Sequence, residues 1–173
     1  MKYSQIFLDL DGVLADFTKA AAKIHKIELP SEMEEDFLYS KFAKKGHFWS
    51  KCNSHEFWAN IPRYPWAKDL VRLVDRSGIN FTFLTKAPMG TGAWSGKARW
   101  IESNFGAHQN KLWVVRGDKS IMAQKGYLLI DDKTSSIEGW RERGGDAFQW
   151  KELSADNTEQ AKYYLEQVRR LIS

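Results

Sequence analysis

The stretch Ile6-Phe-Leu-Asp-Leu-Asp-Gly-Val-Leu-Ala-Asp-Phe17 decides the fold of this chain. Its apolar start, Ile6 to Leu8, ends in two carboxylates, Asp9 and Asp11. Side chains two residues apart on an extended chain point the same way, so Asp9 and Asp11 share one face at the C-terminal end of a strand. In open α/β sheets, ligands bind at that end of the strands. The stretch therefore predicts a strand that leads directly into a ligand site.

Two carboxylates this close repel each other and stay partly protonated unless a cation compensates them. Mg2+ prefers one or two carboxylates together with substrate phosphate oxygens, so it suits this pair. The alternative is an Asp pair that only caps a turn before Gly12. A second acidic pair, Asp131-Asp132, also follows an apolar run, residues 127–130, and this repetition favours a metal site.

Length and composition limit the classes of protein to which this chain can belong. With 173 residues, of which 43% are hydrophobic, the chain is predicted to form one domain with room for a small insertion. No apolar run approaches the roughly 20 residues of a membrane span, so no membrane partner is expected. Residues 1–5 lack the apolar core of a signal peptide, and the single cysteine, Cys52, fits a reducing compartment. A cytoplasmic location is the expectation.

The charge balance is mildly basic. Lysine and arginine number 26 against 22 acidic residues, a formal net charge of +4, and the charges are interspersed along the chain. That pattern indicates an ordinary solvated surface or a site that attracts phosphate. No basic stripe with interleaved aromatics is present, so no stable nucleic-acid partner is expected. A nucleic-acid end-processing factor stays as an alternative, which steep salt dependence would reveal.

Short apolar strands alternate with helices along most of the chain. Strands are predicted at 79–84, 112–115, 127–130 and 147–150, and helices at 65–78, 94–105, 137–143 and towards the C-terminus. This alternation predicts a parallel sheet covered by helices on both faces, which is a Rossmann-like three-layer α/β/α core.

The interval between the first two strands is far longer than the roughly 10–12 residues that a crossover needs. Asp16 is placed to cap a helix over 17–27, and a second, charged helix is predicted over 32–45, ended by Gly46. An aromatic-rich stretch follows. We therefore expect a small helical cap at residues 18–64, inserted into a core of residues 1–17 and 65–173.

Polar side chains follow four of the predicted strands: Asp9 and Asp11, then Thr85, then Lys119, then Asp131 and Asp132. In a parallel sheet all of them meet at one edge and supply a nucleophile, a hydroxyl donor, a cation and a metal site. Phosphoryl transfer needs these parts, because its catalysis is mostly positioning and charge neutralisation. Asp131 and Asp132 are adjacent, so we expect them to point to opposite sides, with Asp132 ligating the metal and Asp131 orienting it.

Along essentially its whole length, the sequence resembles the haloacid dehalogenase (HAD)-type phosphohydrolases. Asp9-Leu-Asp11-Gly-Val matches their first motif, Thr85 the second, Lys119 the third and Asp131-Asp132 the fourth. Within that superfamily it is most similar to the 5'(3')-deoxyribonucleotidases, through residues 9–17, 97–106, 116–123 and 128–132.

This resemblance implies a Mg2+-dependent phosphomonoesterase that dephosphorylates nucleoside monophosphates, with deoxyribonucleotides favoured. It implies that Asp9 attacks phosphorus to form an aspartyl-phosphate, and that Asp11 acts first as an acid and then as a base. Asp9, the Asp11 backbone carbonyl and the pair at 131–132 would hold Mg2+, while Thr85 and Lys119 would hold phosphate oxygens. A homodimer is implied by the resemblance alone.

Two alternatives stay open beside this interpretation. A HAD phosphatase for another small phosphoester, such as a sugar phosphate, would use the same residues, and a small cap would leave its site open enough. A non-catalytic nucleotide-binding protein is the other alternative, although a degenerate copy would be expected to have lost some of the motif residues.

Three further cations are candidate phosphate or substrate contacts. Lys97 and Arg116 are expected either to contact the phosphate or to lie on a solvated helix face and a surface turn. Lys86 departs from the deoxyribonucleotidase pattern, which usually has a small hydroxyl residue after the threonine. We expect this extra cation to alter contacts to the phosphate or the base.

The cap should supply specificity through its aromatic residues. Phe17 and Trp58 are expected to stack on a nucleobase, because every base offers a π-face. The other aromatic residues, Phe48, Trp49 and Phe57, are expected mostly to form the core of the cap and its contact with the main domain.

Overall fold

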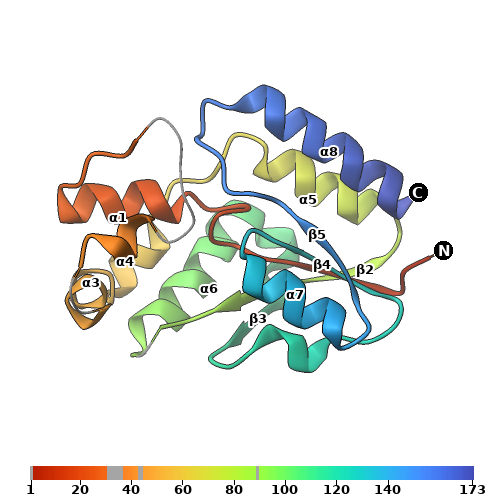
Figure 1. Cartoon of the computed structure of the whole chain (residues 1–173), viewed down its shortest axis with the longest axis horizontal. Coiled ribbons are helices and arrows are strands. Elements are labelled where there is room, and N and C mark those ends of the chain that lie inside the picture. The colour runs from red at the N-terminus through yellow and green to blue at the C-terminus, as the bar shows by residue number, and fades with distance from the viewer. Residues whose placement is uncertain (1, 31–36, 43–44, 89) are drawn as a thin grey trace.

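The computed structural model describes residues 2–30, 37–42, 45–88 and 90–173. Its centre is a five-stranded parallel sheet in the spatial order β3-β2-β1-β4-β5 (Figure 1). The strands are β1 (Gln5–Leu8), β2 (Asn80–Lys86), β3 (Leu112–Val115), β4 (Tyr127–Asp131) and β5 (Asp146–Gln149). The predicted parallel sheet is confirmed, and β1 is its central strand.

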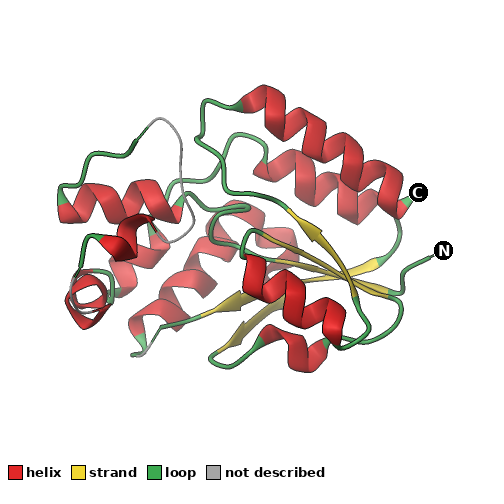
Figure 2. Ribbon diagram, in the orientation of Figure 1, coloured by secondary structure: helices red, strands yellow, loops and turns green. Residues whose placement is uncertain are grey.

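Helices cover both faces of this sheet (Figure 2). One face packs against α5 (Ala67–Arg76), α6 (Gly92–Phe105) and α8 (Thr158–Ile172), and the other against α7 (Thr134–Glu142) and a short 3-10 helix, η2 (Lys119–Met122).

The alternation of side chains along β1 explains the two layers of helices. Ile6 and Leu8 point into the large core that includes α5, α6 and α8. Phe7 points the opposite way, into a second cluster with Leu84 and Trp140. A strand that is apolar on both faces is buried on both, so the three-layer α/β/α prediction is confirmed.

The core helices form where they were predicted, and most of their ends differ from the predicted ends by one to three residues. Helix α5 is followed by Gly78, whose φ of 73° is the left-handed conformation that a glycine adopts without steric cost. A 3-10 helix, η1 (Gly106–Lys111), lies between α6 and β3 and was not predicted, because this polar stretch shows no apolar period.

The insertion between β1 and β2 is helical, with α1 (Phe17–His25), α2 (Phe37–Ser40), α3 (Lys45–Lys51) and α4 (His55–Ala59). Asp16 caps α1 as predicted, because its side chain accepts a hydrogen bond from the Lys19 N–H at 3.0 Å. The helix predicted over 32–45 lies partly outside the described residues. Of its described part, α2 is helical, residues 41–42 are not, and Lys45 already belongs to α3.

The prediction that Gly46 ends a helix is wrong, since Gly46 lies inside α3. Burial of aromatic side chains outweighs the poor helix propensity of glycine here. Phe48 of α3 is fully buried, and its ring centroid lies 6.2 Å from that of Phe17 in α1.

Helix α4 packs very closely on core helix α6. A Cβ atom added at Gly96 would lie 2.4 Å from the Cβ atom of Trp58. Around this contact, the Trp100 Nε1–H donates to the Ile61 carbonyl at 2.7 Å, and His55 Nδ1 lies 2.9 Å from Ser95 Oγ. The C-terminal part of residues 18–64 is therefore joined firmly to α6, and the cap boundaries stay a prediction.

Within the described part of the chain, no helix has the length and apolar character needed to cross a membrane.

Candidate active site

The loop after β1 is a tight turn that places the first two carboxylates. The Leu10 carbonyl accepts hydrogen bonds from the N–H groups of Leu14 and Ala15, both at 2.8 Å. Gly12 adopts φ +77° in this turn, and a Cβ atom added there would lie 2.5 Å from Asp132 Oδ2. Both the backbone angle and the close approach of Asp132 therefore require glycine.

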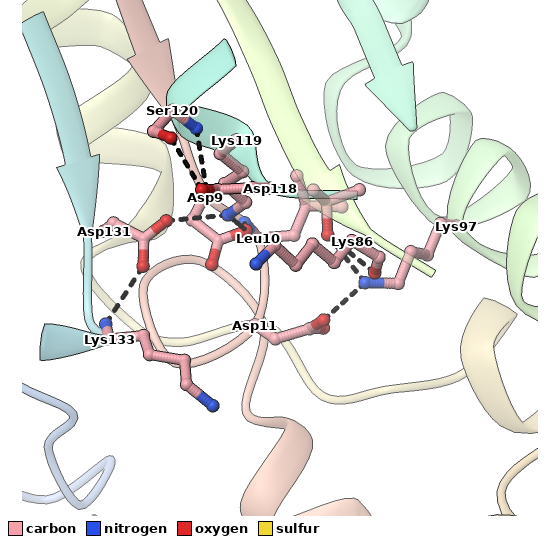
Figure 3. A network of polar contacts seen from close by, with 11 residues as sticks. Asp9, Leu10, Asp11, Lys86, Lys97, Asp118, Lys119, Ser120, Asp131 and Lys133 are labelled. Carbon is pink, nitrogen blue, oxygen red and sulfur yellow. Dashed lines mark hydrogen bonds and ion pairs between the residues drawn. The ribbon is translucent and has the colours of Figure 1, made fainter. Parts of the chain in front are cut away.

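Lys119 joins the end of β1 to the end of β4. Its Nζ lies 2.7 Å from Asp9 Oδ1 and 2.7 Å from Asp131 Oδ2, and its side chain is 2% exposed (Figure 3). Burial by itself would lower the pKa of this ammonium, but the carboxylates of Asp131 and Asp9 outweigh burial and raise the pKa above its ordinary value. Lys119 therefore stays charged and neutralises part of the negative charge around Asp9.

Lys97 reaches the site from α6. Its Nζ donates to Thr85 Oγ1 at 2.6 Å, forms an ion pair with Asp11, and lies 4.6 Å from the ring centroid of Trp58. Its side chain is 2% exposed, so the interpretation of Lys97 as part of a solvated helix face is wrong. A carboxylate, a hydroxyl and an aromatic face together compensate the buried cation.

Three carboxylates gather beside Lys119. Oxygens of Asp9, Asp131 and Asp132 all lie within 4.8 Å of one another. Burial raises the pKa of Asp9 to about 6, with the charges of Asp131 and Asp11 adding to it and Lys119 opposing it. Burial, and then the charges of Asp131 and Asp9, also raise the pKa of Asp132 well above its usual range. The cluster carries more negative charge than Lys119 offsets.

This donor set fits Mg2+, which takes hard carboxylate oxygens and relieves repulsion of this kind. Asp9, Asp131 and Asp132 are the side chains that could hold the ion. The Asp11 side chain is directed to Lys97 instead, and the role of its backbone carbonyl as a ligand stays a prediction.

The expectation that Asp131 and Asp132 point to opposite sides is wrong, since both contribute to the carboxylate cluster. Strand β4 ends at Asp131, so the strict alternation of side chains ends there too. One carboxylate oxygen of Asp131 accepts a hydrogen bond from Lys119, and the other accepts one from the Lys133 N–H at 3.0 Å. Asp132 as the direct metal ligand therefore stays the prediction.

A cavity of about 710 Å³ opens beside these residues. Of the described residues, its charged lining comprises Asp9, Asp11, Asp131, Asp132, Glu152, Lys86, Arg116, Lys119, Lys133 and Lys151. Its apolar lining comes largely from the insertion: Phe17, Phe37, Leu38, Trp49 and Trp58. The charged floor and apolar wall suit a ligand with an anionic end and an apolar end.

The aromatic side chains of the wall form a stack. The ring centroids of Phe17 and Trp58 lie 5.3 Å apart at an interplanar angle of 14°, and those of Trp49 and Trp58 lie 6.4 Å apart at 17°. Trp58 is only 1% exposed and Phe17 9%, whereas Trp49 is partly exposed. Sequence reasoning had assigned Trp49 to the core of the cap.

Glu152 is a cavity residue that the sequence analysis missed. Burial raises the pKa of Glu152 above its usual range, and the charges of Asp16 and Asp11 add to this effect, while hydrogen bonding with Thr18 opposes it. A signal was present in the sequence, because Glu152 follows the predicted fifth strand just as the other site residues follow theirs. It was missed because no motif marks it.

Lys86 and Arg116 both line the cavity, on its β2–β3 side. The Arg116 guanidinium lies 5.6 Å from the ring centroid of Trp94. Lys86 ends β2 and is exposed. The structure thus brings Asp9, Asp11, Lys86, Arg116, Lys119, Asp131 and Asp132 to one cavity, with Thr85 and Lys97 directly behind Asp11.

Structures of other proteins share this fold. A haloacid dehalogenase-like hydrolase from Streptococcus pneumoniae matches with a TM-score of 0.57 at 14% identity, covering 98% of this chain and 99% of that one. The magnesium-bound HAD hydrolase YfnB from Bacillus subtilis matches at 0.53 and 12%, covering 85% and 86%. A HAD family hydrolase from Deinococcus radiodurans with bound phosphate and sodium matches at 0.56 and 11%, covering 99% and 95%. At these identities the likeness shows the fold.

A family model identifies the chain more closely. The family described as 5' nucleotidase, deoxy (pyrimidine), cytosolic type C protein matches residues 3–157. That span runs from the start of β1 past β5 and includes the insertion and the whole charged lining of the cavity. The chain is accordingly a phosphomonoester hydrolase of the nucleotidase type, and its substrate is a small phosphate ester. It belongs to the 5' nucleotidase, deoxy (pyrimidine), cytosolic type C family, within the HAD superfamily of hydrolases.

Proposed function

We propose that this enzyme hydrolyses nucleoside monophosphates, with deoxyribonucleotides favoured, in a Mg2+-dependent reaction through an aspartyl-phosphate on Asp9. One observation carries this proposal above the others. Asp9 lies in a cluster of three carboxylates, at the meeting point of a charged lysine and a cavity with an aromatic wall. The cavity therefore brings together a nucleophile, a cation that neutralises charge, and an aromatic wall for a nucleobase.

In the first half of the reaction, an Asp9 carboxylate oxygen attacks phosphorus. A bond forms between this oxygen and phosphorus, and the ester bond to the leaving oxygen breaks. Asp11 donates its proton to the leaving alkoxide, which departs as an alcohol. Lys119 is 2.7 Å from Asp9 and charged, so it offsets the negative charge that gathers between the carboxylate and the phosphoryl group.

In the second half, water attacks the phosphorus of the aspartyl-phosphate. Asp11, now deprotonated, takes a proton from that water, the bond between phosphorus and the Asp9 oxygen breaks, and inorganic phosphate leaves. The Lys97 ammonium is hydrogen-bonded to Thr85 and paired with Asp11. This ion pair keeps the Asp11 carboxylate oriented in both halves of the reaction. Asp9 and Asp132 would hold Mg2+, with Asp131 orienting the site, and the ion would supply charge neutralisation for the phosphoryl oxygens and for the nucleophile.

The aromatic wall supports a nucleotide as the substrate. Phe17, Trp49 and Trp58 form the stack beside the cavity, and Trp49 is its partly exposed member. Stacking of a base on an aromatic ring tolerates every base. The family description names deoxy (pyrimidine) substrates and cytosolic proteins, which supports deoxyribonucleotides and a cytoplasmic location.

The test is phosphate release from a panel of deoxyribonucleoside and ribonucleoside monophosphates and sugar phosphates, with Mg2+ or with EDTA. Asp9→Asn is the inactive variant, and Asp156→Asn, an exposed position outside the cavity, is its matched control. We expect Mg2+-dependent release that favours deoxynucleotides, is lost in Asp9→Asn and is retained in Asp156→Asn. Release from sugar phosphates alone would contradict the nucleotide assignment and keep the chemistry.

A further inference from the structure

Glu152 is a charged residue of the cavity that the reaction outlined above does not use. It follows β5, is half-buried, and lines the cavity together with Thr18 of α1. Within the described part of the chain it forms no ion pair, whereas Asp9, Asp11 and Asp131 are each paired with a lysine. Its polar contacts inside the protein are instead with hydroxyl groups.

Two hydroxyl groups hold the Glu152 carboxylate. The side chains of Thr18 and Tyr64 are both hydrogen-bonded to it, and both hydroxyls donate, since these bonds favour the charged form of the carboxylate. A carboxylate has about four acceptor positions, so two donors leave acceptor positions for a ligand in the cavity.

The two donors come from the two ends of the insertion, and one of them is fixed by its own packing. Thr18 lies in the first turn of α1, and Tyr64 follows α4. The Tyr64 ring is buried and stacks on Trp66 with ring centroids 4.5 Å apart, and its backbone N–H donates to the Leu14 carbonyl at 2.9 Å. Glu152 is thereby oriented by well-packed neighbours, as a residue that selects a substrate requires.

Glu152 lies beside the place of the leaving group. In the proposed reaction Asp11 protonates the leaving oxygen, and Asp11 is near enough to Glu152 for its charge to raise the pKa of Glu152. Thr18, which is hydrogen-bonded to Glu152, directly follows Phe17 of the aromatic wall. The part of a nucleotide that lies between its phosphate and its base is the sugar, so the sugar is the part that Glu152 faces.

The charges around Glu152 decide which ligand group fits there. Asp16 and Asp11 both raise its pKa, so its surroundings are acidic and disfavour a second anionic group. A neutral hydroxyl group meets no such repulsion, and its hydrogen bond to a carboxylate is a strong one. The raised pKa does not remove the acceptor, because a protonated carboxyl group still accepts through its other oxygen.

We propose that Glu152 is a specificity-determining residue, which accepts a hydrogen bond from the 3'-hydroxyl group of the sugar of the substrate. The inference rests on the proposed function and deepens it, because it selects nucleoside 5'-monophosphates whose 3'-hydroxyl group is free. A site built to bind a hydroxyl group rejects an analogue that lacks it, because the acceptor of the site is then left unpaired.

The experiment compares kcat/KM for thymidine 5'-monophosphate and for 2',3'-dideoxythymidine 5'-monophosphate, which lacks the 3'-hydroxyl group, in the presence of Mg2+. Glu152→Met removes the acceptor, Glu152→Gln retains an acceptor oxygen, and Thr18→Val removes one of the two donors. Glu138→Met is the control, since Glu138 lies exposed on α7 and outside the cavity.

In the wild-type enzyme we expect the substrate with the 3'-hydroxyl group to be preferred roughly 10- to 100-fold. Glu152→Met should bring the ratio of the two constants close to one, and Glu152→Gln should retain most of the preference. Thr18→Val should lower the ratio in part, because the carboxylate loses one of the groups that orient it. Glu138→Met should leave the ratio unchanged. Both constants are measured on one preparation, so their ratio does not depend on the folded fraction of a variant.

A wild-type ratio near one would overturn the proposal. An unchanged ratio in Glu152→Met, with both constants lowered equally, would also overturn it, since Glu152 would then only support the fold. Titration calorimetry on Asp9→Asn gives a readout that does not need turnover. There thymidine 5'-monophosphate should bind more tightly than the dideoxy analogue, and adding Glu152→Met should abolish the difference. If neither ester is hydrolysed, the proposed function fails, while the calorimetric difference still decides for or against the contact.

Discussion

Lys97 Nζ lies 2.6 Å from Thr85 Oγ1, which joins core helix α6 to the end of strand β2 inside the active site. The same ammonium is paired with Asp11 and covered by Trp58. The loop after β1, helix α4 and the end of β2 thus all contact one buried cation, although they are far apart in sequence. The position of Asp11 depends on this cation, and so does the packing of α4 on the core.

Replacing Lys97 by methionine should keep the side-chain stem and remove the charge. We expect kcat to fall by roughly 10²-fold, because Asp11 loses the partner that orients it, as for other single preorganised donors. The free energy of unfolding should fall by roughly 1–3 kcal/mol, because Thr85 loses a buried hydrogen bond. Steady-state kinetics and urea unfolding check both effects.

Lys162→Met is the control for this variant, since Lys162 lies exposed on α8 with Glu159 as its partner. It should change neither kcat nor stability appreciably. Wild-type turnover in Lys97→Met would show that Asp11 is oriented without Lys97.

Gly12→Ala should weaken Mg2+ binding as well as folding. The new Cβ atom would lie 2.5 Å from Asp132 Oδ2 in a residue with φ +77°, so the carboxylate must move and the backbone is strained. Gly78→Ala is the matched control, with φ +73° and nothing within 4 Å. Both variants should lose about 1–2 kcal/mol from the backbone conformation. Only Gly12→Ala should lower Mg2+ affinity, measured by calorimetry, and equal affinities would contradict the placement of Asp132.

Gly96→Ala should destabilise the packing of α4 on α6. Its Cβ atom would lie 2.4 Å from the Cβ atom of Trp58, so the two helices must separate, at a cost of roughly 1–3 kcal/mol. Gly46→Ala is the control, because Gly46 also lies in a helix but has nothing within 4 Å, and alanine there should be neutral or stabilising. Urea unfolding of both variants is the measurement, and equal midpoints would argue against the close helix contact.

Cys52 should resist alkylation in the folded protein. Its side chain is fully buried, and burial raises the pKa of the thiol from 9.0 to about 11. A raised thiol pKa means that little thiolate exists at pH 8 in the folded state, and the reactive fraction grows only as the pH rises towards 11. Mass spectrometry after iodoacetamide treatment should show slow modification that urea accelerates. Rapid modification without urea would place Cys52 at the surface.

Local sequence signals were enough for the fold and for most of the charged site. Alternating apolar strands and helices predicted the three-layer sheet, and the end of each strand marked Asp9, Thr85, Lys119 and Asp131. These predictions hold because side-chain alternation, helix period and strand direction are properties of short segments, and parallel strands bring their ends to one edge.

Tertiary structure alone decided which of these residues touch. Lys97 could equally have been a solvated residue of α6 until the fold buried it against Asp11, 86 positions away in the chain. The shared cluster of Asp131 and Asp132 and the helix that contains Gly46 could likewise not be predicted from local sequence. Each depends on which distant segments pack together and on how much water they exclude, and this burial sets both the contacts and the pKa values of the site.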